Sequence, residues 1–483
     1  MKVFYGMAFT GKTFDEIVKE RQELQKKAKL YKLDLVEQFI GVEEKSKFEA
    51  HSYGPLFIAE KDHALLKKAD LVIADYSEHS IGRDCEIVIS KEVFDKRVIS
   101  VVPDEHMKNH PWVRLYSDYI VSTREEAFIL AKELSKLSLS PQLSTLTRQQ
   151  KDLVDEEIAD LLEKQGLSQV IELLPTELKR RWQALFGKEV EEVIKSSFQS
   201  LPKTIRVNTL KTTASKFLEI AKLYSWQLQP LSFTKNAFRL PPEVKLYFGD
   251  IPEHEAGLFY VQELASMLPV IALNPKPGEK VLDIAAAPGS KTTQMAELMK
   301  NKGSILANDI SEERMQILKK AVTRLGITII DYHLGDASAL GDIYPETFDK
   351  VLVDAPCSTE GILRYKAHKF LEWSLLLIYR ITKVQKQLIE SGFKALKPGG
   401  TMVYSTCAFS PEENEAIVNS LIKKYSTARI EQIEFKGVKT RKGLVNWEHL
   451  DLNAELARAV RIYPQDNDSI GFFIAKIAKK NSK

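Results

Sequence analysis

Alternation of apolar strands and helical segments in the second half of the chain is the feature that most narrows its possible fold. From Glu279 onward, short apolar runs alternate with helical patterns; the runs include KVLDIAAA, GSILANDI, FDKVLVDA and TMVYSTC. Apolar runs of this length are typical of parallel strands that are buried on both faces. The alternation therefore predicts an α/β fold whose helices cover both faces of a mostly parallel sheet.

The rest of the chain divides by changes in pattern. A strand at residues 2–9, a helix at 13–30 and buried strands at 69–77 and 97–102 predict an N-terminal α/β domain over residues 1–137. The polar stretch SLSPQLSTLTRQQ predicts a linker at 138–150. A helical segment followed by a small α+β domain is expected over residues 151–270. The α/β domain with the clearest alternation of strands and helices is expected over residues 271–480.

Composition excludes several classes of protein. Apolar residues make up 44% of the 483 residues, and no apolar run is long enough to cross a bilayer, so no membrane span is expected. The three cysteines, Cys85, Cys357 and Cys407, cannot form a disulfide framework, which indicates a reducing, cytoplasmic setting. Neither CxxC nor HExxH occurs, and no metal is expected. The net charge of +3 neither demands nor excludes a nucleic-acid partner.

Polar residues at successive strand ends predict a cofactor site. VLDIAAAPGSKT is a strand that breaks at Pro288 and Gly289 and enters a helix, so backbone N–H groups at the helix start face a ligand. Asp309 ends the next strand, about 20 residues after Gly289, where a carboxylate accepts ribose hydroxyls; the alternative is an N-capping Asp. Asp336 follows the third strand, where either an adenine contact or a plain turn fits.

Two cysteines end the fourth and fifth strands of this series. DAPC ends in Cys357, and STC ends in Cys407. Each alone is readily explained as a small buried residue, but two thiols at equivalent strand ends indicate covalent catalysis, in which a thiolate is the nucleophile. Position alone does not choose between them. Asp354 lies where it can hydrogen-bond a base edge, and Lys291 either supports charge there or is a solvated lysine.

Residues from about 150 to 480 resemble the Nol/Nop/Sun (Fmu) family of RNA cytosine-5 methyltransferases. The matching strings are RVNTLK, YVQELASMLP, LDIAAAPGSKTTQ, ANDIS, GDA, DAPCSTEG, KPGGTMVYSTCAFSPEENE and RIYPQDNDSIGFFIAKI. The resemblance implies a Rossmann-like class I methyltransferase domain with seven strands, the last antiparallel, behind a small α+β RNA-binding domain. One departure is Thr359, since the family often has DAPCSG.

The resemblance also implies roles for the site residues. Cys407 is the expected nucleophile toward cytosine C6, Cys357 the residue that aids product release, and Asp354 the contact to the N3/N4 edge. S-adenosyl-L-methionine is the expected cofactor, bound by Ala285, Ala286, Ala287, Pro288, Gly289, Ser290, Lys291, Asp309, Asp336 and Asp354. The expected partner is tRNA or rRNA that presents a flipped or single-stranded cytosine. Phosphate contacts are expected from Lys179, Arg180, Arg181, Lys203 and Arg206.

The N-terminal segment resembles a different superfamily, the nucleoside 2-deoxyribosyltransferases and Rcl-type N-hydrolases, which implies a flavodoxin-like domain. The resemblance is carried by EKDHALLKKADLVIADYSEHSIGRDCEIVISKEVFDKRVISVV, in which Glu86 matches the nucleophile and Asp62 an assisting acid. The turn GMAFTGK carries Phe9 where an Arg is common. Two alternatives to methyl transfer are therefore deoxynucleotide N-glycosidic hydrolysis or transfer in this domain, and a non-catalytic RNA-binding factor.

Overall fold

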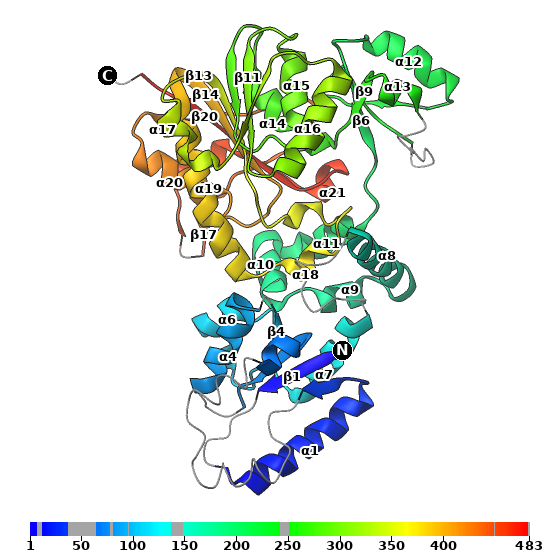
Figure 1. Cartoon of the computed structure of the whole chain (residues 1–483), viewed down its shortest axis with the longest axis vertical. Coiled ribbons are helices and arrows are strands. Elements are labelled where there is room, and N and C mark those ends of the chain that lie inside the picture. The colour runs from blue at the N-terminus through cyan, green and yellow to red at the C-terminus, as the bar shows by residue number, and fades with distance from the viewer. Residues whose placement is uncertain are drawn as a thin grey trace. The chain divides into compact units, whose positions relative to one another are not determined.

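The computed structural model describes residues 1–6, 12–36, 64–77, 81–94, 96–136, 148–241, 251–448 and 450–481. The chain forms two compact units (Figure 1). The first unit comprises Met1–Ile194 and Lys366–Leu377, and the second comprises Lys195–Tyr365 and Ile378–Lys483. No helix within the described ranges is long and apolar enough to cross a membrane.

A five-stranded parallel sheet is the centre of the first unit. Its strands occur in the order β2-β1-β3-β4-β5; the bounds are β1 Lys2–Gly6, β2 Asp34–Val36, β3 Leu71–Asp75, β4 Arg97–Val101 and β5 Tyr119–Val121. This sheet and its helices confirm the α/β class that was predicted for the N-terminal domain. Every residue of β3 and β4 is buried, as the continuous apolar runs predict.

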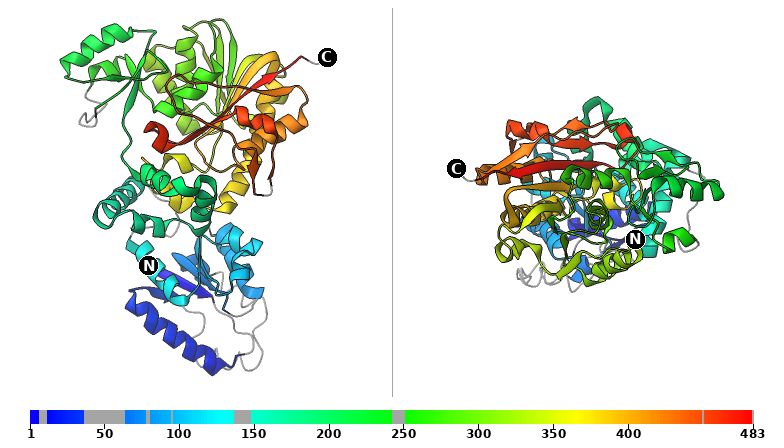
Figure 2. Two further views of the ribbon diagram at one scale, coloured as in Figure 1. Left: turned by 180° about the vertical axis from the view of Figure 1, so that it is seen from behind. Right: turned by 90° about the horizontal axis from the view of Figure 1, so that it is seen from above.

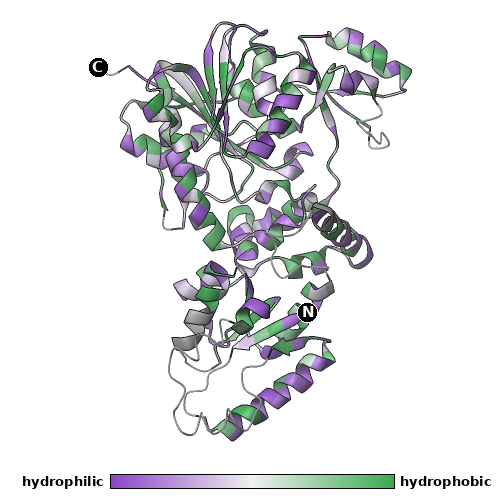
Figure 3. Ribbon diagram, in the orientation of Figure 1, coloured by the Kyte–Doolittle hydropathy of each residue, from purple (hydrophilic) through white to green (hydrophobic). Residues whose placement is uncertain are grey.

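Helices cover this sheet and extend beyond it. They are α1 Phe14–Leu30, α4 Ile81–Glu92, α5 Glu105–Lys108, α6 Pro111–Tyr116 and α7 Arg124–Lys136, followed by α8 Arg148–Gln165, α9 Leu167–Leu173 and α10 Thr176–Phe186. Helix α1 begins after Thr13 because Thr13 and Glu16 form a capping box, with the Glu16 carboxylate accepting from the Thr13 N–H at 2.7 Å. Both hydrophobic and hydrophilic residues occur along α1 (Figure 3), and its apolar residues Phe14, Ile17, Leu24 and Ala28 are buried.

The second unit begins with a small antiparallel sheet. After α11 (Val190–Phe198), four strands occur in the order β7-β8-β6-β9; the bounds are β6 Thr204–Val207, β7 Gln229–Pro230, β8 Ala237–Arg239 and β9 Phe259–Val261. Helices α12 (Ala214–Leu223) and α13 (Pro252–Glu255) accompany it. This arrangement confirms the small α+β fold that was predicted around LPKTIRVNTLK.

A nine-stranded mixed sheet forms the rest of the second unit. Its main path is β12-β11-β10-β13-β14-β20-β19-β16, and β15 pairs with β20; the bounds are β10 Lys280–Asp283, β11 Ser304–Asp309, β12 Ile330–Leu334, β13 Phe348–Asp354, β14 Leu396–Thr406, β15 Ala428–Glu431, β16 Arg441–Lys442, β19 Val460–Ile462 and β20 Phe472–Lys479. Strand β20, the last, is antiparallel to β14, as predicted. The sheet has two strands more than the seven that the resemblance implies, and its added strands include the two-residue β16.

Helices cover both faces of this sheet (Figure 2). On one face lie α14 Leu264–Leu273, α15 Ser290–Leu298 and α16 Glu312–Leu325, and on the other α17 Leu340–Ile343, α19 Leu375–Ala395 and α20 Glu415–Lys424. Alternate strand residues enter two separate cores: Val403 packs with the first set, and Met402 and Tyr404 with the second. The sheet is therefore closed to water on both faces, and its carboxyl edge is left for ligands.

Candidate active site

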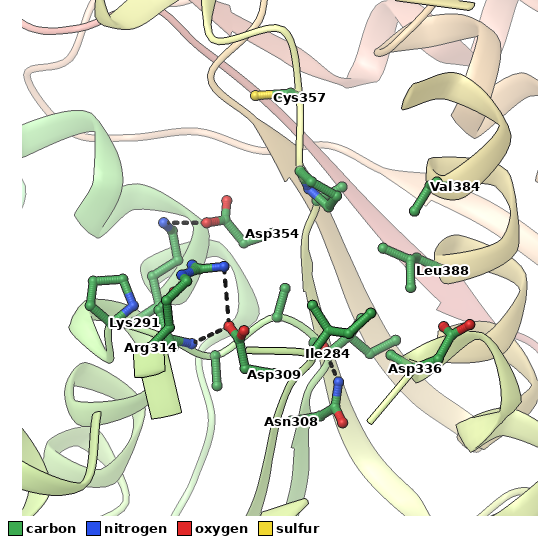
Figure 4. Close-up of a pocket in the computed structure, with 18 of the residues that line it drawn as sticks. Ile284, Lys291, Asn308, Asp309, Arg314, Asp336, Asp354, Cys357, Val384 and Leu388 are labelled. Atoms are coloured by element: carbon green, nitrogen blue, oxygen red, sulfur yellow. Dashed lines mark hydrogen bonds and ion pairs between the residues drawn. The ribbon is translucent and has the colours of Figure 1, made fainter. Parts of the chain in front are cut away.

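The carboxyl ends of β10, β11, β13 and β14 surround a cavity of about 350 Å³ (Figure 4). Neighbouring strands are parallel, so the polar residues that end them meet at one edge. The cavity is lined by Ile284, Ala285, Ala286, Ala287, Pro288, Ser290, Lys291, Asn308, Asp309, Ile310, Arg314, Gly335, Asp336, Ala337, Asp354, Ala355, Pro356, Cys357, Thr359, Val384, Leu388 and Cys407. These include all the residues that the sequence proposed for the cofactor and for catalysis in this domain, except Gly289.

Gly289 shapes the loop that forms one wall of the cavity, although it does not line the cavity itself. Its φ of +109° belongs to the region that side chains rarely adopt, and a Cβ there would lie 2.6 Å from Leu318 Cδ1. The turn thus brings the start of α15 close to α16. The Ala287 N–H donates to Asp309 Oδ2 at 3.1 Å, which ties the loop to the end of β11.

Two of the predicted cofactor carboxylates differ in exposure. Asp309 is 2% exposed, and it accepts from the Ser311 N–H at 3.0 Å and lies 3.3 Å from the Arg314 guanidinium. The N-cap of α16 is Ser311, so Asp309 is not the capping residue. Asp336 is exposed and accepts from the Ser338 N–H at 2.9 Å. Asp309 thus orders the floor of the cavity, and Asp336 lies at its rim.

Both oxygens of Asp354 are held by neighbouring side chains. Lys291 Nζ donates to Oδ2 at 2.6 Å, and Ser405 Oγ donates to Oδ1 at 2.7 Å (Figure 4 shows the first contact). Burial alone would lower the pKa of Lys291, but the Asp354 carboxylate outweighs it and the pKa is raised. Lys291 is therefore a buried cation within the site and is not a solvated lysine at a helix start.

The two thiols lie side by side. Cys357 Sγ and Cys407 Sγ are 3.2 Å apart, and both are free. The pKa of the Cys357 thiol is raised well above its usual value by its hydrogen bond with Cys407 and by partial removal from water. Either sulfur can donate in this hydrogen bond, so the pair provides one thiol as a possible nucleophile and the other as its hydrogen-bond partner.

A further buried acid lies directly beneath the cofactor loop. Asp283, at the end of β10, is 1% exposed and accepts from Thr292 Oγ1 at 2.7 Å. Its second oxygen is buried and has no hydrogen-bond partner among the described residues. Burial raises the pKa of Asp283 to about 7, and the nearby carboxylate of Asp354 adds to the effect. This acid therefore titrates near neutral pH.

Several residues that line the cavity or hold its lining side chains were missed by sequence reasoning. Ser405 pairs with Asp354 across β13 and β14, so correct strand register would have indicated it. Arg314 lies in the first turn of α16, the helix after Asp309, and its guanidinium also donates to the Ala287 carbonyl oxygen. Val384 and Leu388 come from α19, which covers the second face of the sheet. Their apolar side chains carry no chemical signal in a sequence.

Two of the proposed phosphate contacts are wrong, because the side chains are buried. Arg206 is 4% exposed and its guanidinium contacts Glu297, Gln262 Oε1 at 2.7 Å and Thr293 Oγ1 at 3.0 Å. Arg181 is also only 4% exposed. Both are structural cations, whereas Arg180 and Lys203 remain exposed and Lys179 is half-buried.

The proposed residues of the N-terminal domain stay untested. Asp62 lies outside the described residues. Glu86 lies on α4, but its side chain also lies outside what the structure describes.

Comparison with known proteins decides the family. Residues 270–478 match the family model described as 16S rRNA methyltransferase RsmB/F, and residues 174–264 match the N-terminal domain of 16S rRNA methyltransferase RsmF. The tRNA (cytosine(49)-C(5))-methyltransferase of Pyrococcus abyssi is 41% identical over 283 residues, which are 58% of this chain and 89% of that protein. The chain belongs to the RsmB/F family of RNA methyltransferases.

Other relatives agree with this family. Ribosomal RNA small subunit methyltransferase F of Vibrio cholerae is 42% identical over 294 residues, which are 60% of each chain. The crystal structure of a methyltransferase homolog protein from Pyrococcus horikoshii superposes with a TM-score of 0.57 at 33% identity, covering 67% of this chain and 99% of that one. This member of the family is an S-adenosylmethionine-dependent RNA cytosine-C5 methyltransferase.

The residues present fit that cofactor. A loop at a helix start and a buried carboxylate at the end of the next strand are the features that hold an adenosyl group in such sheets. The cavity has both, in Ala285–Lys291 and Asp309, and its volume of about 350 Å³ is of the size that small ligands need. The expectation of S-adenosyl-L-methionine is confirmed by the family.

Proposed function

We propose that this enzyme methylates C5 of a cytosine in tRNA or rRNA by a covalent mechanism in which Cys407 is the nucleophile. The Cys407 thiolate adds to C6 of the base, which makes C5 electron-rich enough to accept a methyl cation. The bound cofactor supplies that methyl group from its sulfonium. Loss of the C5 proton then restores the C5–C6 double bond, and the bond between Cys407 Sγ and C6 breaks.

The observation that carries this proposal is the pair of thiols, 3.2 Å apart, that both line the cavity. A thiolate is the competent nucleophile, and the buried Lys291 cation lies close enough to Cys407 to interact with it electrostatically. Asp354 is held by Lys291 and Ser405, and we propose that it contacts the N3/N4 edge of the cytosine. Cys357 aids the release of the product.

Incubating the enzyme with RNA and labelled S-adenosylmethionine tests the mechanism. We expect Cys407→Ala to abolish label transfer and Cys357→Ala to trap a protein–RNA adduct that survives a denaturing gel. The matched control is Cys85→Ala, which changes the third cysteine and should transfer label as the wild type does. Transfer that is unaffected by Cys407→Ala would contradict the proposed nucleophile.

The substrate follows from the relatives and from the geometry. Relatives act on tRNA or on small-subunit rRNA, and we propose one of these classes for this chain. The base must leave its stack to enter a cavity at a sheet edge, so a single-stranded or flipped cytosine is favoured. Residues 151–270 are proposed to bind RNA, with Arg180, Lys203 and Lys179 as phosphate contacts. Bisulfite sequencing of total RNA with and without the enzyme would identify the cytosine.

The finer domain division is part of the same proposal: residues 1–137, 138–150, 151–270 and 271–480, in a cytoplasmic protein that binds neither membrane nor metal. The first domain is proposed to be a flavodoxin-like relative of the nucleoside deoxyribosyltransferases, which its strand order 2-1-3-4-5 supports. A deoxynucleotide hydrolysis assay of the wild type and Glu86→Gln tests its activity. Absence of hydrolysis in both would leave it a binding module.

A further inference from the structure

The two peptide groups that flank Cys357 are each held by a buried side chain from elsewhere in the chain. Gln385 Nε2, on α19, donates to the Pro356 carbonyl oxygen at 2.8 Å. Glu413 Oε2, in the segment between β14 and α20, accepts from the Ser358 N–H at 2.8 Å. Both side chains are fully buried. The backbone on either side of the thiol is therefore fixed by contacts that water does not reach.

These two side chains also contact each other. Gln385 Nε2 donates to Glu413 Oε2 at 3.2 Å. The remaining oxygen of each, Oε1, is buried and has no hydrogen-bond partner among the described residues. Burial, assisted by the carboxylate of Glu360, raises the pKa of Glu413 to about 8.

The segment that follows Cys407 is held by a different carboxylate. Glu360 Oε2 accepts from the N–H groups of Phe409 and Ser410 at 2.6 and 2.7 Å, and the Gly361 N–H donates to the Cys407 carbonyl oxygen at 2.7 Å. Each cysteine loop thus sends one glutamate to the other loop. Glu360 holds the loop of the nucleophile, and the side chain of Glu413 holds the loop of Cys357.

We propose that Glu413 is a positioning residue for product release, acting through Cys357. This inference rests on the proposed function, in which Cys407 attacks and Cys357 aids release. In the release step the C5 proton passes to water, its bonding pair forms the C5–C6 double bond, and the S–C6 pair returns to Cys407 Sγ. The Cys357 S–H donates a hydrogen bond to that departing sulfur. It does so because Glu413 and Gln385 hold it 3.2 Å away.

The proposal predicts that formation and breakdown of the adduct respond differently to one substitution. A general structural defect would slow both steps. Attack depends on Cys407, whose loop is held by Glu360, whereas release depends on the Cys357 loop. Loss of the Glu413 side chain should therefore slow breakdown of the adduct and spare its formation.

The experiment follows single-turnover label transfer from S-adenosylmethionine to RNA and the lifetime of the protein–RNA adduct on denaturing gels. We expect Glu413→Ala to lengthen the adduct lifetime roughly tenfold, the effect of one lost buried hydrogen bond, with methyl transfer within about threefold of wild type. Glu413→Gln keeps an amide oxygen for the Ser358 N–H and should restore release. The matched control is Glu412→Ala, because Glu412 Oε1 accepts from Trp447 Nε1 at 3.2 Å instead.

Binding of S-adenosylhomocysteine, measured by calorimetry, establishes that each variant is folded. Wild-type release in a folded Glu413→Ala enzyme would overturn the inference, and so would a Gln variant that accumulates adduct as the Ala variant does. If Glu413→Ala does not fold, Gln385→Met carries the same test, and normal release from it would overturn the inference. Absence of methyl transfer by the wild type would instead refute the proposed function.

Discussion

Replacing Glu415 by methionine is expected to destabilise the second unit by about 3–5 kcal/mol, because it leaves the Arg461 guanidinium buried without its anion. Arg461 is 1% exposed and Glu415 fully buried. Arg461 donates to both carboxylate oxygens, from Nε at 2.7 Å and from Nη2 at 2.5 Å. Glu415 Oε1 also accepts from the Leu444 N–H at 2.9 Å, so the same change leaves a second donor unpaired.

Scanning calorimetry measures this effect. At roughly 2–4 °C per kcal/mol for a unit of more than 150 residues, the midpoint should fall by on the order of 10 °C. The transition of the second unit is identified by its upward shift with S-adenosylhomocysteine, since a ligand stabilises only the unit that binds it. Replacing Glu415 and Arg461 together by methionine should recover most of the loss, because no charge then stays buried.

Glu412→Met is the matched control, since Glu412 is only partly buried and does not form part of this ion pair. A Glu415→Met midpoint no lower than that of the control would refute the reasoning. A double variant as unstable as the single one would also refute it, because the loss would then come from packing and not from an unpaired charge.

Three other substitutions test local features. A Cβ at Gly361 would lie 2.7 Å from the Cys407 carbonyl oxygen, so Gly361→Ala should lower both methyl transfer and the melting midpoint. Gly289→Ala, at φ +109°, should weaken S-adenosylhomocysteine binding in calorimetry. Burial raises the pKa of Asp283 to about 7, above its value in the unfolded chain. The free energy of unfolding of the wild type therefore falls as pH rises from about 4 to about 7. Asp283→Asn should flatten this dependence in urea unfolding between about pH 4 and pH 7; an unchanged slope would contradict the assignment.

The location of the site was accessible from sequence because it depends on local pattern. Apolar runs that stop at Asp309, Asp354 and Cys407 mark strand ends, and parallel strands bring such ends to one edge. The structure places all three residues around one cavity. The same reasoning gives β20 as the last strand, since its apolar run FFIAKI is as clear as those of the parallel strands.

Side-chain contacts between segments that are distant in the chain could not be predicted from the sequence. Arg206 looks like a surface cation in the sequence, and only the fold reveals that Glu297 and Gln262 surround it. The contact of Ser405 with Asp354 depends on the register of two strands, and the contact of Glu413 with Ser358 joins residues 55 positions apart. Side-chain partners at such separations are set by tertiary packing, for which a single sequence carries no period or spacing.

The segment Lys366–Leu377 has a consequence for how the chain is made. It follows the Cys357 loop in sequence but belongs to the first unit, where Phe370, Leu371 and Trp373 are buried and the His368 N–H donates to Asp155 at 2.6 Å. The N-terminal unit therefore remains incomplete until the ribosome has passed residue 377. Truncation near residue 194 would leave three large apolar side chains without cover, so the methyltransferase portion expressed by itself is expected to aggregate unless that segment is replaced.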